Sequence, residues 1–243
     1  MVKRKVANPL AFAVLGSLSE RPMHPYEIST MLKTRGKDMS IKLNYGSLYS
    51  VVAALEKHGF IEAVETLRDG NRPERTVYDI TEAGRLEFQD WLTELLGTPE
   101  KEFSQLEAGL AYLPAFPPGR VVELLDQRIV ALEAEIAEVE AAHASMEAIK
   151  FPRVFWVESE LRLALLKTQA DFVRQLAKEI RSEELEGSTF WRKGYELVEA
   201  QGIKPADLFK DPLKYFGEEF TWMQAMPPEG PPEPKSESTP EPK

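Results

Sequence analysis

The stretch NYGSLYSVVAALEKHGFI, residues 44–61, decides the fold of the N-terminal region. Read as a helix, it has one apolar face, and such a face predicts packing into a core. The apolar face consists of Leu48, Val51, Val52 and Leu55, and the opposite face carries Tyr45, Ser47, Tyr49, Ala53 and Lys57. That second face combines aromatic, hydroxyl and basic groups with few acids, which raises the question of its partner.

The segments around this stretch follow the order of a winged helix-turn-helix. Apolar spacing and turn residues predict helices at about 8–19, 24–35 and 44–58, strands at 60–66 and 75–80, and a further helix at about 81–96. A turn containing arginines, LRDGNRPE, separates the two strands. In this fold the third helix enters the major groove of DNA and the hairpin forms the wing. We therefore interpret the mixed face of the third helix as a DNA-contacting face.

Ten residues are candidate DNA contacts: Lys42, Asn44, Tyr45, Ser47, Tyr49, Lys57, Arg68, Asn71, Arg72 and Arg75. Ser47 and Tyr49 can donate to a phosphate or a base edge, and the lysines and arginines can neutralise phosphates. Arg72 can instead enter a narrow minor groove. The KRK at residues 3–5 is either an extra phosphate clamp or a start without contacts. The alternative for the tyrosines is packing on a neighbouring element, and for the arginines it is solubility alone.

Composition excludes several classes of function. The 243 residues include no cysteine, which rules out disulfides, thiolate metal sites and thiol nucleophiles. The three histidines are scattered, and no phosphate-binding, dinucleotide-binding or nucleophile motif is present. We therefore expect no catalytic residues, no metal site and no cofactor, and an enzyme acting on a small aromatic acid is disfavoured. No apolar run is long enough to span a bilayer, and Asn8-Pro9 begins a core helix rather than a signal peptide, so we expect a cytoplasmic protein.

The net charge of −10 is unevenly distributed. Residues 1–80 hold 12 Lys and Arg against 9 Asp and Glu, whereas residues 81–243 hold 18 against 31. A mildly basic head joined to an acidic body can still approach a polyanion head first. The acidic total leaves a second interpretation open, a winged helix used only as a protein-interaction module without specific DNA binding.

Three segments together resemble transcriptional regulators of the PadR family: LAFAVLGSLSERPMHPYEISTML, GSLYSVVAALEKHGFI and RTVYDITEAGR, within roughly residues 9–90. The sequence departs from the family pattern at Pro25, Ser50 and the alanines at 53 and 54, which bears on the operator sequence rather than on the fold. The resemblance implies a homodimeric repressor that binds a palindrome near its own promoter. It also allows for release from DNA by a small molecule such as a phenolic acid or a hydrophobic drug.

Residues 119–149 support a dimer independently of the resemblance. Their apolar residues recur at steps of three and four over about four heptads, as in a coiled coil. The predicted dimerisation residues are Val122, Leu125, Ile129, Leu132, Ile136, Val139 and Met146. The alternative is that this helix packs inside one chain. His143 also lies in the seam, either as a tolerated polar residue or as a pH switch.

A second long helix is predicted at 152–182, and the two helices would form an antiparallel pair that turns at Phe151-Pro152. Its predicted core face is Val157, Leu161, Leu165, Phe172, Leu176 and Ile180. In a dimer the pair would hold the two heads apart by about 34 Å, the spacing of successive major grooves. The aromatic residues of 188–222 either dock onto the helical body or form a lid over an effector pocket or a partner site. The proline-rich residues 227–243 are predicted to be disordered.

These inferences combine into one prediction. The fold is mainly α, with an N-terminal winged helix-turn-helix carrying a two-stranded wing and a C-terminal helical dimerisation domain. The predicted domains are 1–97 (DNA-binding), 98–185 (dimerisation), 186–226 (aromatic-rich extension) and 227–243 (tail). The predicted function is a DNA-binding transcriptional regulator, a homodimeric repressor of a palindromic operator that a small hydrophobic or aromatic effector releases. Its predicted partners are double-stranded DNA, a second copy of the chain and that effector, without a membrane.

Overall fold

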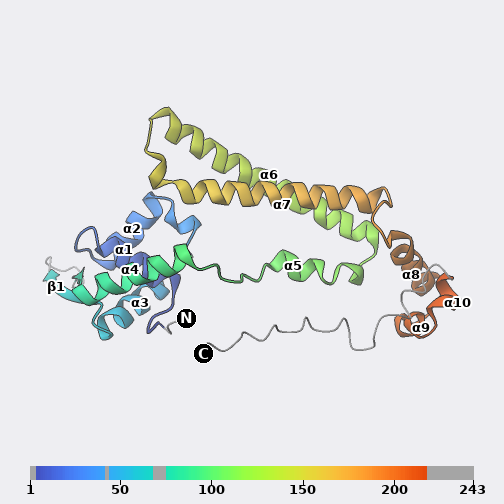
Figure 1. The fold of residues 1–243 in the computed structure, drawn as a ribbon, viewed down its shortest axis with the longest axis horizontal. Helices are drawn as coiled ribbons and strands as arrows, with labels where there is room; N and C mark the ends of the chain where they lie inside the picture. Colours follow the sequence, from blue (N-terminus) through green and yellow to red (C-terminus); the bar gives the residue numbers. More distant parts are fainter. Residues whose placement is uncertain (1–3, 42–43, 68–74, 218–243) are drawn as a thin grey trace, which may run out of the picture. The chain divides into compact units, whose positions relative to one another are not determined.

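The computed structural model describes residues 4–41, 44–67 and 75–217 (Figure 1). The chain divides into two compact units, residues 1–102 and 103–243. The predicted DNA-binding domain lies within the first unit. The predicted subdivision of the remainder at residues 185 and 226 stays a prediction, and the predicted tail lies outside the described residues.

The first unit is a winged helix. Its elements are α1 (Pro9–Leu18), α2 (Pro25–Thr34), the 3-10 helix η1 (Lys37–Met39), α3 (Tyr45–Lys57), β1 (Ile61–Leu67), β2 (Arg75–Ile80) and α4 (Glu82–Gly97). The two strands pair antiparallel, from Ile61 opposite Ile80 to Leu67 opposite Arg75, with a bulge between Ala63 and Glu65. Each helix and strand predicted in this unit lies within one residue of its observed bounds, so the predicted fold class is confirmed.

Local capping chemistry explains why the helices begin where they do. The side-chain oxygens of Asn8 and Asn44 accept the N–H groups of the residues two positions on, at 2.9 and 3.0 Å. The Thr81 hydroxyl accepts the Gly84 N–H at 3.1 Å and donates to the Gly59 carbonyl at 2.6 Å. Each cap satisfies a donor that has no partner within its helix. Gly59, with a φ of +73°, then turns the chain out of α3.

The core of this unit forms beneath α3. Leu48 and Leu55 are buried in one cluster with residues of α1, α2 and α4. Gly84 brings α4 into close contact with the end of α3, because a Cβ at this position would lie 2.0 Å from the Phe60 carbonyl oxygen. Only glycine fits that approach, and α4 is therefore held against the backbone that leads from α3 into the wing.

The second unit is entirely helical in the part that the structure describes. Its elements are α5 (Gln105–Leu110), η2 (Leu113–Ala115), α6 (Pro118–Ala148), η3 (Arg153–Phe155), α7 (Val157–Arg181), α8 (Ser188–Gln201), α9 (Pro205–Lys210) and α10 (Pro212–Phe216). The long helices α6 and α7 lie side by side as a hairpin (Figure 1).

Ion pairs at heptad intervals fix the register of this hairpin. Arg181 pairs with Asp126 at 2.8 Å, Arg174 with Glu133 at 2.9 Å, and Lys167 with Glu140 at 2.6 Å. The residue numbers fall along α7 as they rise along α6, so the helices are antiparallel, as predicted. These pairs are exposed, and such pairs contribute at most about 1 kcal/mol each. They specify alignment more than they add stability.

The seam predicted for a dimer is buried within one chain. Leu125, Leu132 and Val139 are buried in the α6–α7 hairpin, as is His143. The other predicted dimerisation residues, Val122, Ile129, Ile136 and Met146, are half-buried. The single-chain alternative that the spacing left open therefore accounts for the buried members of the seam, and a contact of the seam with a second copy stays a prediction.

Two predictions about the second long helix are wrong. The helix begins at Val157 rather than at 152, because Lys150 has a φ of +53° and Trp156 is also non-helical, with a 3-10 turn between them. Its core face is also different. The residues buried on α7 are Ala170, Val173, Ala177 and Ile180, whereas Val157, Leu161, Leu165 and Phe172 are exposed. Of the predicted face, only Ile180, which is buried, and Leu176, which is half-buried, pack into the core.

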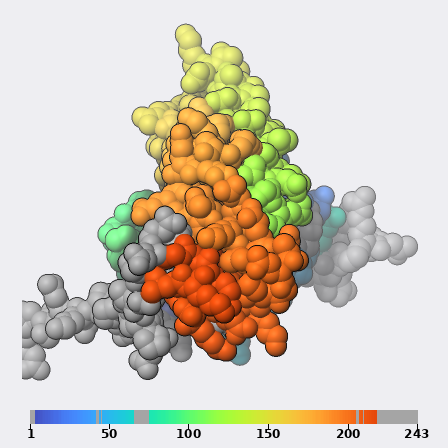
Figure 2. Space-filling model, turned by 90° about the vertical axis from the view of Figure 1, so that its right-hand side faces the viewer, coloured from blue at the N-terminus to red at the C-terminus, as the bar shows by residue number. Residues whose placement is uncertain are grey.

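The aromatic-rich extension docks onto the base of the hairpin, as predicted. Trp191 of α8 is buried in the cluster that contains Val121 and Leu125 of α6. Helices α9 and α10 close a second small cluster around Phe216. Figure 2 shows α8–α10, in orange and red, packed at this end of the hairpin.

Candidate nucleic-acid interface

The exposed face of α3 carries the described part of the predicted site. Ser47, Tyr49 and Lys57 are exposed, and half of the Tyr49 surface is accessible to solvent, at 50%. Asn44 is exposed too, but its side-chain oxygen already caps the helix, so only its amide nitrogen can donate outward. The tyrosine hydroxyl can donate to a phosphate or a base edge, and the lysine can neutralise a phosphate.

The wing supplies one described candidate. Arg75, the first residue of β2, is exposed. The candidates Lys42, Arg68, Asn71 and Arg72 lie outside the described residues, as does the side chain of Tyr45. The structure therefore places Ser47, Tyr49 and Lys57 on α3, Asn44 at its N-cap, and Arg75 at the end of the wing next to the turn.

Tyr78 connects the wing to the segment before α2 and to α3. Its backbone exchanges two hydrogen bonds with Met23, just before α2, both at 3.0 Å. Burial raises the pKa of Tyr78, and the charge of Glu56 and a hydrogen bond to that carboxylate raise it further. Glu56 belongs to α3, so one acid on this helix is engaged with the wing. The strand and the two helices are thus held as one rigid platform.

His24 caps α2 next to this platform. Its Nδ1 accepts the Tyr26 N–H at 3.1 Å, and the Glu27 carboxylate accepts the His24 N–H at 2.9 Å. An imidazole nitrogen that accepts cannot carry a proton, so the cap requires neutral His24. Burial lowers the pKa of His24, and the charge of Arg75 lowers it further, against an opposing effect of Glu27. His24 is thus the N-cap of α2, and His58 is the C-cap of α3.

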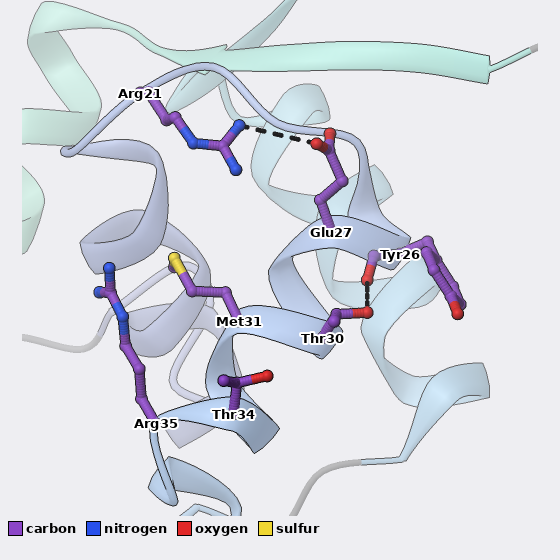
Figure 3. Close-up of a pocket in the computed structure, with 7 residues that line it drawn as sticks. All are labelled: Arg21, Tyr26, Glu27, Thr30, Met31, Thr34 and Arg35. Atoms are coloured by element: carbon purple, nitrogen blue, oxygen red, sulfur yellow. Dashed lines mark hydrogen bonds and ion pairs between the residues drawn. The ribbon is translucent and has the colours of Figure 1, made fainter.

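The outer face of α2 carries a shallow hollow of about 340 Å³ (Figure 3). We name it the α2 hollow; it is lined by Arg21, Tyr26, Glu27, Thr30, Met31, Thr34 and Arg35. Arg21 lies 3.7 Å from Glu27, and Arg35 is paired with Glu20 through both guanidinium nitrogens. The first helix of a helix-turn-helix crosses the DNA backbone, so Tyr26 and Thr30 are further candidates. Neither residue was predicted from the sequence, although their i, i+4 spacing on a polar face is visible there.

Arg4 is engaged inside the first unit. Its guanidinium pairs with Glu87 at 2.7 Å, Asp90 at 3.0 Å and Glu94 at 2.5 Å, and it lies over the Trp91 ring at 5.1 Å. Only 6% of the Arg4 side chain is exposed. The hypothesis that KRK forms a phosphate clamp is therefore wrong for Arg4, because its charge is already matched by acids of α4. Lys3 lies outside the described residues.

The described parts of the chain hold neither a candidate metal site nor a helix suited to span a membrane. No group of three or more potential ligands there could hold a metal ion. No described helix has both the length and the apolar character needed to cross a membrane.

Residues 14–90 match the model of the transcriptional regulator PadR-like family. The chain is 22% identical over 147 residues to the negative transcriptional regulator PadR of Bacillus subtilis, covering 60% of this chain and 79% of that protein. The structure is similar to Bacillus subtilis PadR in complex with operator DNA, with a TM-score of 0.59, 18% identity, and coverage of 71% of this chain and 99% of that chain.

The same protein in complex with p-coumaric acid gives a TM-score of 0.59 at 16% identity, covering 71% and 98% of the two chains. The virulence activator AphA of Vibrio cholerae gives 0.57 at 15% identity, covering 72% and 99%. These structures share the fold of this chain. Residues 14–90 are thus similar to the transcriptional regulator PadR-like family, and the solved structures show that the chain shares their winged-helix fold.

Proposed function

We propose that this regulator binds a palindromic operator as a homodimer, that α3 reads the major groove, and that the bound dimer represses transcription. The observation that carries the proposal is the exposed face of α3, on which Tyr49 and Lys57 stand beside few acids, while Glu56 is engaged by Tyr78. An activator and a negative regulator occur among the similar proteins. Repression is proposed because the relative with a sequence match is a negative regulator.

The proposed contacts have different roles. Ser47 and Tyr49 lie in the first turns of α3 and would reach base edges, since the N-terminal part of a recognition helix enters the groove. Lys57 and Arg75 would contact phosphates, together with Lys42, Arg68 and Arg72. Asn71 would approach the backbone from the wing turn. Asn44 and Tyr45 begin the helix and complete the proposed set.

The proposed dimer contact is the exposed apolar stripe of α7. Val157, Leu161, Leu165 and Phe172 are 50, 63, 62 and 54% exposed, and they recur at helical spacing along one face. A second copy related by twofold symmetry would cover this stripe with its own. The contact leaves the α6–α7 seam intact, because the seam uses the other face of α7.

The proposed effector is a small aromatic acid. The support is a structurally similar protein that was solved with p-coumaric acid. Such a ligand would release DNA only by binding the DNA-free conformation more tightly than the bound one. p-Coumaric acid is therefore the first compound to add to the binding assay below.

Fluorescence anisotropy on DNA from immediately upstream of the protein's own gene tests the proposal, against a scrambled duplex of equal length and across a salt series. We expect the wild type to bind the upstream duplex selectively, and we expect Tyr49→Ala to abolish this binding. Tyr49→Phe should weaken binding if the tyrosine hydroxyl donates a hydrogen bond to the DNA, and should leave it unchanged otherwise. Arg75→Ala should reduce the salt slope by about one. Arg85→Ala, a loss of the same charge from an exposed residue of α4, is the matched control and should leave the slope unchanged.

Equal and weak binding to both duplexes would call for a selection of bound fragments from the whole genome. A selection that returned no enriched fragment would refute specific DNA binding. The protein-interaction module would then be the better account of the same fold.

A further inference from the structure

Helix α8 is hydrogen-bonded to the segment that precedes α6. The Trp191 indole N–H donates to the Phe116 carbonyl at 2.7 Å, and the Tyr195 hydroxyl donates to the Pro114 carbonyl at 3.1 Å. Both acceptors are backbone groups, of which Pro114 lies in η2 and Phe116 follows it directly. Two side chains one helical turn apart therefore hold the same short piece of backbone.

Apolar packing adds to these bonds. Trp191 is buried in the cluster at the base of the hairpin, and Leu106 of α5 and Leu113 of η2 pack against that cluster. Tyr195 is half-buried beside them. Residues 105–116 are thus fixed to the hairpin both by hydrogen bonds and by buried side chains, and α8 contributes to each.

This fixed segment belongs to the connector, which we define as residues 98–117, between α4 and α6. Residues 98–104 of the connector contain no helix or strand, and all but Ser104 are exposed. The length of chain between the end of α4 and the first fixed residue is therefore about seven residues. Without the contacts of α8, the length of unfixed chain between α4 and the hairpin would approach that of the full connector, about 20 residues.

We propose that α8 is a clamp that shortens the tether of each DNA-binding unit and thereby makes the dimer selective for the spacing of its two half-sites. The proposal rests on the proposed function, because it needs two DNA-binding units joined in one dimer. Trp191 and Tyr195 act as positioning residues in it. They touch no DNA and set how far each unit can reach.

The expected size of the effect follows from the length of the tether. The effective concentration of a tethered binding unit falls roughly as the −3/2 power of tether length, so a change from seven to 20 residues lowers it about fivefold. A longer tether also spans a wider range of separations, since each extended residue adds about 3.3–3.6 Å. A released clamp should therefore weaken binding to the best operator and weaken discrimination against wrong spacings.

The experiment uses the full chain and the duplex selected by the wild type, together with duplexes whose half-sites are moved by about two and about five base pairs, the latter half a helical turn. We expect the wild type to lose at least about tenfold in affinity on the altered duplexes. Trp191→Ala should bind the original duplex about fivefold more weakly and lose less than about threefold on the altered ones. Tyr195→Phe, which removes one donor and keeps the ring, should give an intermediate result and serves if Trp191→Ala does not fold.

Phe190→Leu is the matched control. Phe190 lies on α8 but packs against Phe216, with ring centroids 4.3 Å apart, in the cluster that α9 and α10 close. The substitution loosens the extension without removing a contact to the connector. Its spacing profile should follow the wild type.

Hydrogen exchange of the amides of residues 105–116 gives a readout that does not depend on DNA. Exchange should accelerate in Trp191→Ala at least about fivefold and stay unchanged in Phe190→Leu. Unchanged exchange in Trp191→Ala would refute the clamp itself. Faster exchange with an unaltered spacing profile would refute its positioning role. A wild type that selects no duplex would overturn the proposed function and the clamp's role with it, a result distinct from the other two.

Discussion

The exposed stripe of α7 allows a decisive test of where the chain dimerises. Leu161 is 63% exposed in the single chain. Full burial of a leucine side chain stabilises by about 2 kcal/mol, so covering the exposed part would contribute about 1.3 kcal/mol in each copy. Twofold symmetry doubles the contribution to about 2.5 kcal/mol, which is about 70-fold in the dissociation constant of the dimer.

Leu161→Ala should therefore raise the dissociation constant of the dimer by up to about 70-fold in sedimentation equilibrium. The free energy of unfolding of the dilute monomer should change by less than about 0.5 kcal/mol. Leu132→Ala should do the opposite. Its side chain is buried in the hairpin, so truncation should destabilise the fold by about 2–5 kcal/mol. Val130→Ala, at another exposed apolar residue, is the control and should change neither quantity.

An unchanged dimer in Leu161→Ala would refute the proposed contact. If Leu132→Ala separated the dimer while the monomer kept its stability, the seam of α6 would be an interface between chains. That outcome would restore the interpretation that heptad spacing first favoured.

Three further predictions concern the first unit. Because burial and the charge of Arg75 lower the pKa of His24, folding favours its neutral form. The contribution of His24 to the free energy of unfolding is therefore fully present above the unfolded pKa of about 6.5 and falls as the pH drops below that value. His24→Asn, which caps the helix without titrating, should remove this pH dependence in urea unfolding at pH 5–8. Gly84→Ala should cost about 3 kcal/mol in the same assay, because its Cβ would collide with the Phe60 carbonyl, and a cost below about 1 kcal/mol would contradict that close approach. Arg4→Ala should destabilise by about 1–3 kcal/mol at pH 7, since it leaves three carboxylates together on α4; the loss should shrink at pH 4, and an equal loss at both pH values would rule out the charge argument.

The first unit was predictable because its signals are local. Asn8-Pro9, Asn44 and Thr81 cap helices by bonds to residues two or three positions away, and Gly59 ends α3 through its own backbone conformation. None of these effects depends on distant parts of the chain. The order of elements then left only the winged helix, and the face of α3 that carries Tyr49 followed from periodicity alone.

The second unit was harder to predict because α7 has two apolar faces. Leucines and a phenylalanine mark the exposed face, whereas Ala170 and Ala177 line much of the buried one. Large side chains outweigh alanines in any hydrophobicity pattern, so the pattern placed all of the predicted core except Leu176 and Ile180 on the exposed face. Small residues belong in the seam because they let α6 and α7 approach closely, and that is decided by the partner helix rather than by the sequence of α7.

The ion pairs of arginines in the first unit limit how steeply the affinity for DNA can fall with salt concentration. Arg4, Arg21 and Arg35 each lie within ion-pair distance of an acid of the same unit, which lessens their ability to neutralise phosphates. The proposed phosphate contacts do not include these three arginines; they are Lys42, Lys57, Arg68, Arg72 and Arg75.

Five cations in each of two units correspond to a slope of log K against log salt no steeper than about −9, whereas eight would give about −14. A measured slope near −14 would mean that the arginines exchange their carboxylates for phosphates on binding. A slope of −9 or shallower would mean that Arg4, Arg21 and Arg35 keep their carboxylate partners when the protein binds DNA.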